Sequence, residues 1–420
     1  PARCRYAHES RVVDDIGRRH VRRLYAEAAL SGLIVGLPHT FIPIFALRLG
    51  ASGQAIGLLT ALPSLVNALW LIPSARLIER QRRLLVPLLV SGFLHGAQYV
   101  LVALIPFAPA SWQVPALLVI IALGAMPIGV YTVVTNAVLA DVVPRGERGP
   151  VLGNRNLLLA LTEAAALALA GWFLTVLPLP LNYQWLFLFV FCCSLLNIAV
   201  LRQLDVRHAA ASTEIAPPVS LSLRSLRRLL RDEGEPQAFV RFLIAAFILL
   251  FSGWLPRPLF SIYWVRELHT TDSWVGTLTA ISAIVSMVGY PLWGRIAEQR
   301  GNRWLLLIGS IGYTIYPTLT ALSPSPGFLI VPVVIGGLLT PPYTLGLLNG
   351  LLDVAPTHHR ATYIALYTAV SSFASFVAPI LSTSTILPLI GIQATLIFGS
   401  GVRFLGWAAV YLLVKKPSQG

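Results

Sequence analysis

The chain has 420 residues, of which 56% are hydrophobic and only 11% are charged, and its mean hydropathy is +0.74. Soluble domains carry about a quarter charged residues, so this composition excludes an ordinary soluble protein and indicates one that crosses a membrane many times. The net charge of +14 does not indicate nucleic-acid binding, because the cationic residues gather in the connections on one side of the apolar segments.

A membrane span needs about 20 mostly apolar residues, and twelve segments of the chain meet that requirement. Because backbone polar groups in lipid must be paired internally, we expect these segments to be helices. They cover residues 24-47, 53-75, 84-107, 113-140, 152-176, 183-202, 238-264, 273-293, 303-322, 327-352, 361-383 and 392-414. The sequence therefore predicts an all-α integral membrane protein with twelve transmembrane helices.

The positions of the 31 Lys and Arg residues predict the orientation. All but four lie at one side of the predicted spans, the exceptions being Arg48, Arg257, Arg266 and Arg403. By the positive-inside rule we expect both termini to be cytoplasmic in a multi-pass protein of the plasma membrane, the bacterial inner membrane. Residues 1-23 are predicted to be a cytoplasmic segment that leads directly into a full-length span, unlike a cleaved signal peptide.

Three short repeats predict that the chain is built of two related halves. Residues 37-48, LPHTFIPIFALR, resemble residues 255-266, LPRPLFSIYWVR. Residues 57-79 resemble 276-298, beginning at Gly57 and Gly276, and DVVPRGERG (141-149) resembles DVAPTHHRA (353-361). Three matches in the same order at offsets of 218, 219 and 212 predict a duplicated unit. We expect six-helix halves at 24-202 and 238-414.

The two halves are joined by a linker, residues 203-237, and the chain ends in a cytoplasmic tail, residues 415-420. Within the linker, VSLSLRSLRRLLRD (219-232) places its leucines and arginines on opposite sides of a helix. That pattern is typical of a basic amphipathic helix on an anionic leaflet. A solvated helix packed on the bundle is an equally good interpretation.

Two six-helix halves with a cytoplasmic linker resemble the major facilitator superfamily of secondary transporters, bacterial type, over essentially the whole chain. The signature of that family after the second helix is G-x-x-x-D-R-x-G-R-R. Here GRIAEQRGNR (294-303) and ARLIERQRR (75-83) each follow it in part. Two signatures of drug-proton antiporters, R-x-x-Q-G in the fourth span and G-P-x-x-G in the fifth, are absent, which counts against drug antiport.

The resemblance implies a charged latch between the halves. In the family the signature acid faces the start of the eleventh helix, and the loop Arg pairs with an acid that ends the fourth. The gating residues thus implied are Arg76, Glu79, Arg80, Asp141, Arg148, Gly294, Arg295, Glu298, Arg300, Gly301, Asp353 and Arg360. The alternative is that they are ordinary solvated charges of the connecting loops.

Ionisable residues within the spans are candidates for the transport site, because a charge at mid-helix costs about 2.5–3.5 kcal/mol and usually faces a cavity or a partner. The candidates are Glu27, His39, His95, Glu163, Arg257 and Arg403. The resemblance implies that the first, fourth, seventh and tenth helices line the cavity, so His95 and Arg403 rank lower. For Arg403 we expect a structural partner.

His39 and Arg257 occupy equivalent positions of the repeat, each beside a proline that loosens a helix. Transporters often place substrate contacts at such breaks. His39 can titrate near neutral pH, Arg257 can bind carboxylate or phosphate, and Glu163 is a countercharge or proton carrier. The alternatives are an interhelical hydrogen bond for His39, a fixed ion pair with Glu163 or another acid for Arg257, and that same pairing or a bond to backbone for Glu163. Further cavity candidates, for which packing is the alternative, are Tyr131, Asn136, Trp254, Tyr343 and Asn349.

The function predicted from these features is secondary transport of a small solute by alternating access. Proton coupling through His39 or Glu163 is a further hypothesis; a facilitative uniporter, a lipid translocator and, least favoured, an integral-membrane lipid-modifying enzyme are the alternatives. The sequence has no nucleotide-binding loop, and its cysteines, Cys4, Cys192 and Cys193, have no metal-ligand spacing. We expect a monomeric permease that contacts membrane lipids and uses no cofactor, metal or nucleic acid.

Overall fold

The computed structural model describes residues 2–79, 81, 84–142, 148–203, 236–355 and 360–414. Within these ranges, side chains are described except at 2–19, 71–72, 75–76, 79, 140–142, 148–149, 236 and 360–362. All regular structure in the described part of the chain is helical. The expected all-α class is therefore confirmed.

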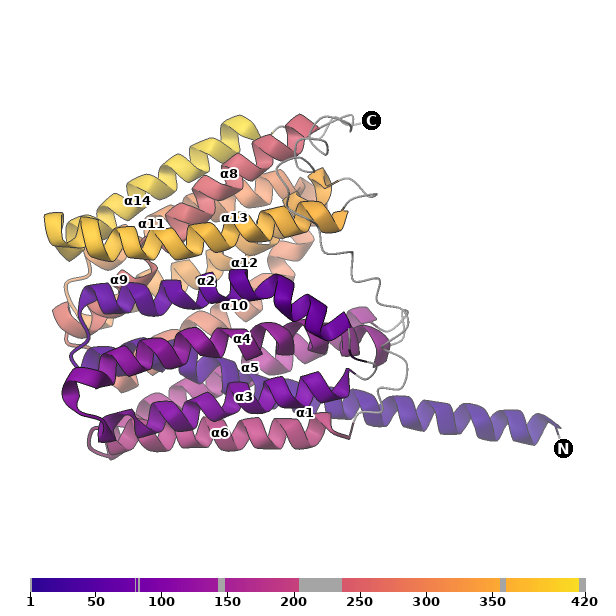
Figure 1. Ribbon diagram of the computed structural model, residues 1–420. Coiled ribbons are helices and arrows are strands. Elements are labelled where there is room, and N and C mark those ends of the chain that lie inside the picture. Colours follow the sequence, from indigo (N-terminus) through magenta and orange to yellow (C-terminus); the bar gives the residue numbers. More distant parts are fainter. Residues whose placement is uncertain are drawn as a thin grey trace.

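The first half of the chain forms one helical bundle (Figure 1). Its helices are α1 (Ala2–Arg48), α2 (Gly53–Glu79), α3 (Leu85–Leu104), α4 (Ala110–Val142), α5 (Arg148–Val176) and α6 (Leu181–Leu201), with a 3-10 turn, η1 (Ile105–Phe107), after α3. Both prolines of α1, Pro38 and Pro43, lie inside a continuous helix.

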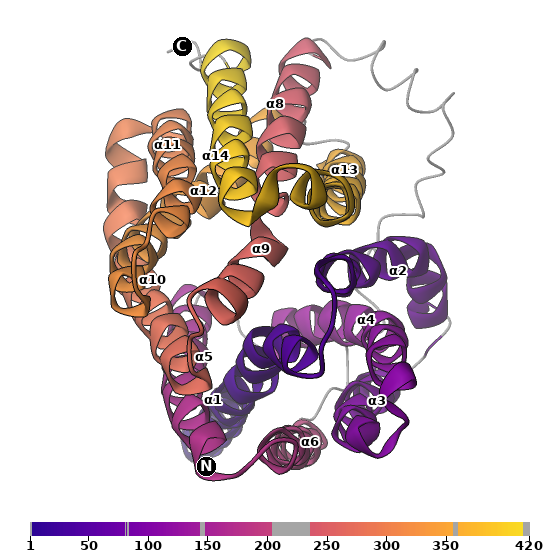
Figure 2. The same ribbon diagram turned by 90° about the vertical axis from the view of Figure 1, so that its left-hand side faces the viewer.

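The second half forms another bundle beside the first (Figure 2). Its elements are α8 (Pro236–Trp254), α9 (Arg257–Ile262), η2 (Tyr263–Glu267), α10 (Asp272–Arg300), α11 (Asn302–Ala321), η3 (Pro326–Leu329), α12 (Ile330–Val354), α13 (Arg360–Leu381), η5 (Ser382–Ile386) and α14 (Leu387–Leu413). The end at which α1 finishes and α10 begins is called the outer end below, after its predicted orientation.

Ten helical segments in the described residues are long and apolar enough to cross a membrane. The eleventh and twelfth predicted spans fall in one of them, Tyr363–Leu413, where Gly391 turns the chain with a φ of +77° that glycine adopts readily. The second predicted span lies in α2, which is not among the ten. The multi-pass character is confirmed, and the count of twelve and the domain boundaries stay predictions.

The bundles are apolar on their outer surfaces as well as inside. Phe45 of α1 stacks on Tyr183 of α6 at 4.9 Å between ring centroids, within a continuous buried core. Large apolar side chains also lie on the outside, including Phe107, Trp112, Leu389 and Leu412. So many exposed large apolar side chains are unusual in a soluble protein, and here they suit contact with lipid.

Glycines allow the two bundles to approach closely. Gly171 of α5 and Gly276 of α10 lie backbone to backbone, so that a Cβ on Gly276 would be 2.9 Å from Gly171 Cα and 2.5 Å from Leu167 O. Between α2 and η5, a Cβ on Gly57 would be 1.9 Å from Thr383 Oγ1. Because Gly57 and Gly276 begin the same repeat, each half uses one copy of it as a close contact with the other half.

Replacing Gly276 with Val is expected to force α5 and α10 apart, because the atoms it would meet are backbone atoms that cannot move aside. Overpacking of this kind costs about 1–3 kcal/mol. The thermal midpoint of the purified protein and its transport rate should both fall. Gly153→Val on α5 is the control, since a Cβ there meets nothing within 4 Å; equal losses in the two variants would contradict the prediction.

Candidate functional site

The seventh predicted span is broken at its middle. Helix α8 ends at Trp254, Leu255 and Pro256 form a turn, and α9 begins at Arg257. Pro256 and Pro258 have no N–H group, so two neighbouring hydrogen bonds of a continuous helix cannot form. In α1 the equivalent Pro38 leaves the helix continuous. The expected disruption is therefore present in the second half only.

Arg257, the first residue of α9, contacts the other half of the protein. Its Nη2 lies 3.0 Å from Nε2 of His39. A guanidinium can only donate, so His39 Nε2 is the acceptor and its imidazole is neutral in this arrangement. The guanidinium carbon also lies 4.4 Å from the centre of the Trp254 ring, a cation-π contact. Both His39 and Arg257 are exposed.

The contact joins two residues that are equivalent in the repeat, His39 and Arg257. Two equivalent positions that touch each other lie on the pseudo-twofold axis between the halves. In Figure 2, α9 indeed lies on the side of its bundle that faces α1. The sequence predicted these two residues for the site, and the structure brings them together.

Glu163 lies near this pair but is not bonded to Arg257. It is partly buried on α5 and packs on Gly36 of α1, where an added Cβ would be 3.1 Å from Oε1. Gly36 precedes His39 by about one helical turn. Among the described side chains the ion pairs are Arg48–Asp272 and Arg155–Glu27. The Arg257–Glu163 pair that the sequence left open is therefore absent from this arrangement.

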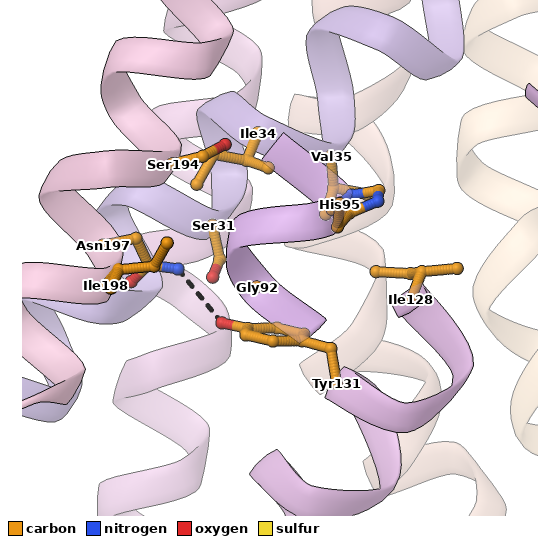
Figure 3. A pocket seen from close by; sticks show the side chains of 10 residues that line it. All are labelled: Ser31, Ile34, Val35, Gly92, His95, Ile128, Tyr131, Ser194, Asn197 and Ile198. Atoms are coloured by element: carbon orange, nitrogen blue, oxygen red, sulfur yellow. Dashed lines mark hydrogen bonds between the residues drawn. The ribbon is translucent and has the colours of Figure 1, made fainter. Parts of the chain in front are cut away.

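Tyr131 lies inside the first bundle, in a small pocket between α1, α3, α4 and α6. Its hydroxyl accepts a hydrogen bond of 3.0 Å from Asn197 Nδ2 (Figure 3). Ser31 and His95 also line the pocket. Asn136 is exposed on α4. Neither Tyr131 nor Asn136 contacts the His39–Arg257 pair.

The remaining cavity candidates belong to the second bundle. Tyr343 is buried and stacks on Tyr313 with 4.7 Å between centroids. Asn349 donates to Asn302 Oδ1 at 3.1 Å, and Asn302 in turn donates to Asp353 at 2.7 Å. Asn349 is thus tied to a residue of the predicted gating group.

The gating group is described in its second copy only. Arg295, Glu298 and Arg300 are exposed, and Gly301 ends α10 with a φ of +81°. Arg300 lies over the Trp304 ring at 5.3 Å, while Asp353 bonds to Asn302, so the expected Arg300–Asp353 ion pair is not formed here. Gly294 lies on the same helix, α10.

The first copy of the gating group cannot be compared in the same way. Arg80 lies outside the described residues. Also outside them are the side chains of Arg76, Glu79, Asp141 and Arg148 in this copy and that of Arg360 in the second copy. The latch that these residues would form remains a prediction.

Sequence reasoning missed a buried ion pair in the first bundle. Arg155 of α5 donates from Nε and Nη2 to both carboxylate oxygens of Glu27 on α1, the shortest contact being 2.8 Å. Ser31 Oγ donates to the same carboxylate at 2.6 Å. Glu27 is only 1% exposed. The pair could have been suspected from the sequence, because Arg155 lies at the start of a predicted span and Glu27 is the acid of the first span.

A second missed feature, called the outer clasp here, consists of Arg48, Ala51, Arg266, Thr270 and Asp272 at the outer end. Arg48 donates to Thr270 O at 3.0 Å and to Asp272 Oδ1 at 2.9 Å. Arg266 donates to Ala51 O. Arg48 and Arg266 are repeat equivalents, and Ala51 and Thr270 are separated by a similar offset of 219. Each arginine therefore bonds to the opposite half in the same way, which links the two halves at this end.

Replacing both clasp arginines with Ala is expected to open the outer end. Hydrogen bonds to charged groups contribute about 1.5–3 kcal/mol, enough to shift a two-state equilibrium by tenfold or more. Spin labels at positions 50 and 269, with the native cysteines replaced, should report a longer separation. Arg295→Ala, at the other end of α10, is the control, and unchanged separations in the double variant would contradict a gating role.

Comparison with known proteins agrees with this architecture. Residues 27–256 and 242–420 both match the sequence model of the Major Facilitator Superfamily. The chain is 26% identical over 267 residues to the cis,cis-muconate transport protein of Acinetobacter baylyi, which covers 61% of the chain and 62% of that relative. It is 27% identical over 143 residues to the quinolone resistance protein NorA of Staphylococcus aureus, covering 34% of the chain and 36% of NorA. These matches span less than two thirds of either relative.

Solved structures share the fold at low identity. The nucleoside transporter NupG matches with a TM-score of 0.75 and 10% identity, covering 95% of the chain and all of NupG. A bacterial homologue of the lysosomal transporter Spinster matches with a TM-score of 0.69 and 17% identity, over 94% and 96% of the two chains. Because the family model matches most of the chain, the chain belongs to the Major Facilitator Superfamily.

Proposed function

We propose that the protein is a secondary transporter of small organic anions, which bind at Arg257 between the two halves. The observation that carries this proposal is the exposed guanidinium of Arg257, which no described carboxylate neutralises. A charge within a span is costly and is usually retained for function. A guanidinium binds a carboxylate through two parallel hydrogen bonds.

One relative supports the choice of substrate class. Muconate, the cargo named for the Acinetobacter baylyi relative, is a small dicarboxylate. Trp254, whose ring already lies under Arg257, offers an apolar face to the carbon skeleton of such a substrate. The site thus combines one cation with one aromatic surface, which suits an unsaturated or aromatic carboxylate.

Alternating access is the transport mechanism that the arrangement supports. The outer clasp links the halves at one end, and His39 and Arg257 meet on the axis between two bundles that touch through small residues. Rocking of the halves about the close glycine contacts would expose the pair to one side at a time. We place both termini on the cytoplasmic side and treat the monomer as the transporting unit.

Proton coupling follows from the chemistry of His39. Protonation of Nε2 removes the lone pair that accepts from Arg257, so the pair separates into two cations, one in each half. A carboxylate can then bridge them. Anion binding and protonation of His39 therefore favour each other. Glu163 of α5, which packs on Gly36 about one turn from His39, is a further proton acceptor.

Uptake into proteoliposomes is expected to rise when the outside is made more acidic than the inside, because anion and proton enter together. His39→Gln keeps an oxygen that can accept from Arg257 but cannot titrate. This variant should still transport, without a response to the gradient. Glu163→Gln tests the other proton carrier in the same assay. Equal flux with and without the gradient in the native protein would indicate a uniporter.

The substrate class is tested by thermal unfolding of the purified protein with a panel of carboxylates and their uncharged amides. A ligand at 100 times its Kd stabilises the folded state by about 2.7 kcal/mol. We expect stabilisation by mono- or dicarboxylates and none by the amides. Stabilisation by neutral solutes alone, or flipping of fluorescent phospholipids by the reconstituted protein, would overturn the proposal in favour of another cargo.

A further inference from the structure

Arg403 of α14 is buried at the junction of three helices of the second bundle, with only 1% of its surface exposed. Its three nitrogens bond to three different backbone carbonyls. Nε donates to Ser252 O at 3.2 Å, Nη1 to Tyr313 O at 2.7 Å and Nη2 to Gly253 O at 3.0 Å. The structural partner expected for Arg403 is therefore the backbone of α8 and α11.

Prolines have left two of these three carbonyls without a helical donor. In a helix, the carbonyl of residue i accepts from the N–H of residue i+4. For Ser252 that residue is Pro256, and for Tyr313 it is Pro317, and neither has an N–H. Gly253 O lies in the last turn of α8, where carbonyls also lack intrahelical partners. One guanidinium thus supplies the donors that two proline positions and one helix end lack.

The charge of Arg403 is held without a carboxylate. The two ion pairs formed by described side chains do not include it. Its guanidinium carbon instead lies 4.2 Å from the centre of the Tyr313 ring, and that ring stacks on Tyr343. A buried charge is strongly penalised unless its hydrogen bonds are satisfied. The three carbonyls therefore take three of the five N–H donors of Arg403, and the Tyr313 ring lies against its guanidinium.

The bonds to Ser252 and Gly253 lie immediately before the turn that presents Arg257. We propose that Arg403 is a positioning residue, which replaces the missing backbone donors at Pro256 and Pro317 and so holds α8 and α9 apart with Arg257 directed at the other half. Lys could not substitute, because one nitrogen cannot reach three carbonyls on two helices. The role of Arg257 as an anion ligand rests on the proposed function; the bonding role of Arg403 does not.

A double-mutant cycle tests the bonding role without any substrate. Arg403→Met is made in the native chain and in a Pro256→Ala/Pro317→Ala chain, in which the N–H groups that the two carbonyls lack are restored. We expect Arg403→Met to lower the Tm of the native chain by roughly 5 °C or more, and that of the proline-free chain by less than half as much. An equal fall in both would overturn the proposal. If Arg403→Met does not accumulate, Arg403→Lys is used in the same cycle.

Matched controls separate this coupling from general destabilisation. Arg303 also donates to backbone carbonyls of α14, those of Tyr411 and Val414, so Arg303→Met should show no coupling to the two prolines. Pro291→Ala, inside α10, should likewise leave the effect of Arg403→Met unchanged. Coupling in either control would also count against the proposal.

The positioning role is read from uptake of an anion that the native protein transports. The Arg403→Met/Pro256→Ala/Pro317→Ala protein should regain most of its Tm. Its KM should stay at least about fivefold above native, because a continuous helix in place of the turn between α8 and α9 no longer directs Arg257 at the other half. Recovery of KM together with Tm would overturn the positioning role. If the native protein transports no anion, the proposed function fails, while the thermal cycle still decides the bonding role.

Discussion

Replacing Arg257 with Ala is expected to abolish saturable anion uptake. The substrate carboxylate would lose the charged donor that binds it, and hydrogen bonds to charged groups contribute about 1.5–3 kcal/mol. Affinity should therefore fall by roughly 10-fold to 150-fold. Arg257→Lys keeps the charge but not the two-pronged geometry, so it should retain weak binding. Kd from thermal shifts and initial rates in proteoliposomes measure both effects.

Two further variants make this expectation specific to the site. Arg295→Ala removes an exposed cation of α10 and should leave affinity unchanged. His39→Ala leaves Arg257 in place and should weaken binding less than Arg257→Ala does. If His39→Ala and Arg257→Ala both transport normally, the proline repeat is scaffold and the substrate binds elsewhere.

Breaking the Glu27–Arg155 pair is expected to have the largest effect on stability. Arg155→Met leaves the Glu27 carboxylate buried, with Ser31 as its remaining donor among the described side chains. Removing one partner of a buried pair costs about 3–5 kcal/mol, whereas replacing both with apolar residues is often neutral. The Arg155→Met protein should thus have a much lower thermal midpoint and yield. The Glu27→Leu/Arg155→Met protein should recover most of the lost thermal stability.

The Arg48–Asp272 pair provides the matched comparison. Its arginine side chain is 31% exposed, against 12% for that of Arg155. Exposed pairs contribute about 0–1 kcal/mol, so Arg48→Met should change the thermal midpoint little even though it weakens the outer clasp. Similar losses of thermal stability in Arg48→Met and Arg155→Met would mean that burial does not determine how much each ion pair contributes to stability.

Hydropathy and repetition predicted the helical class and the family, and they marked His39 and Arg257 as equivalent residues, but they did not predict that the two touch. The helices can be predicted because a chain in lipid must form long apolar helices. The equivalence of the two residues can be predicted because a repeat places the same pattern at two positions of the sequence. The Glu27–Arg155 pair was not predicted, since it depends on which faces of α1 and α5 meet. Likewise, nothing in the residue types shows that Asn349 bonds to Asn302, or that Tyr131 faces a pocket within its own bundle.

Backbone acceptors are the hardest part of such a site to predict. Arg403 and Arg266 bond to carbonyls, which every residue has, so no pattern of side chains marks them. Proline four residues after a carbonyl is the signal that could have been used for Arg403. It becomes informative only once the third helix that supplies the guanidinium is known.

The contact between His39 and Arg257 also bears on the history of the chain. In a symmetric dimer of separate half-chains, the two residues at a twofold axis would be identical. Two arginines there would repel each other and two histidines would carry no permanent charge. Within one polypeptide the two copies can differ, so one permanent cation and one proton-accepting base can face each other between the halves.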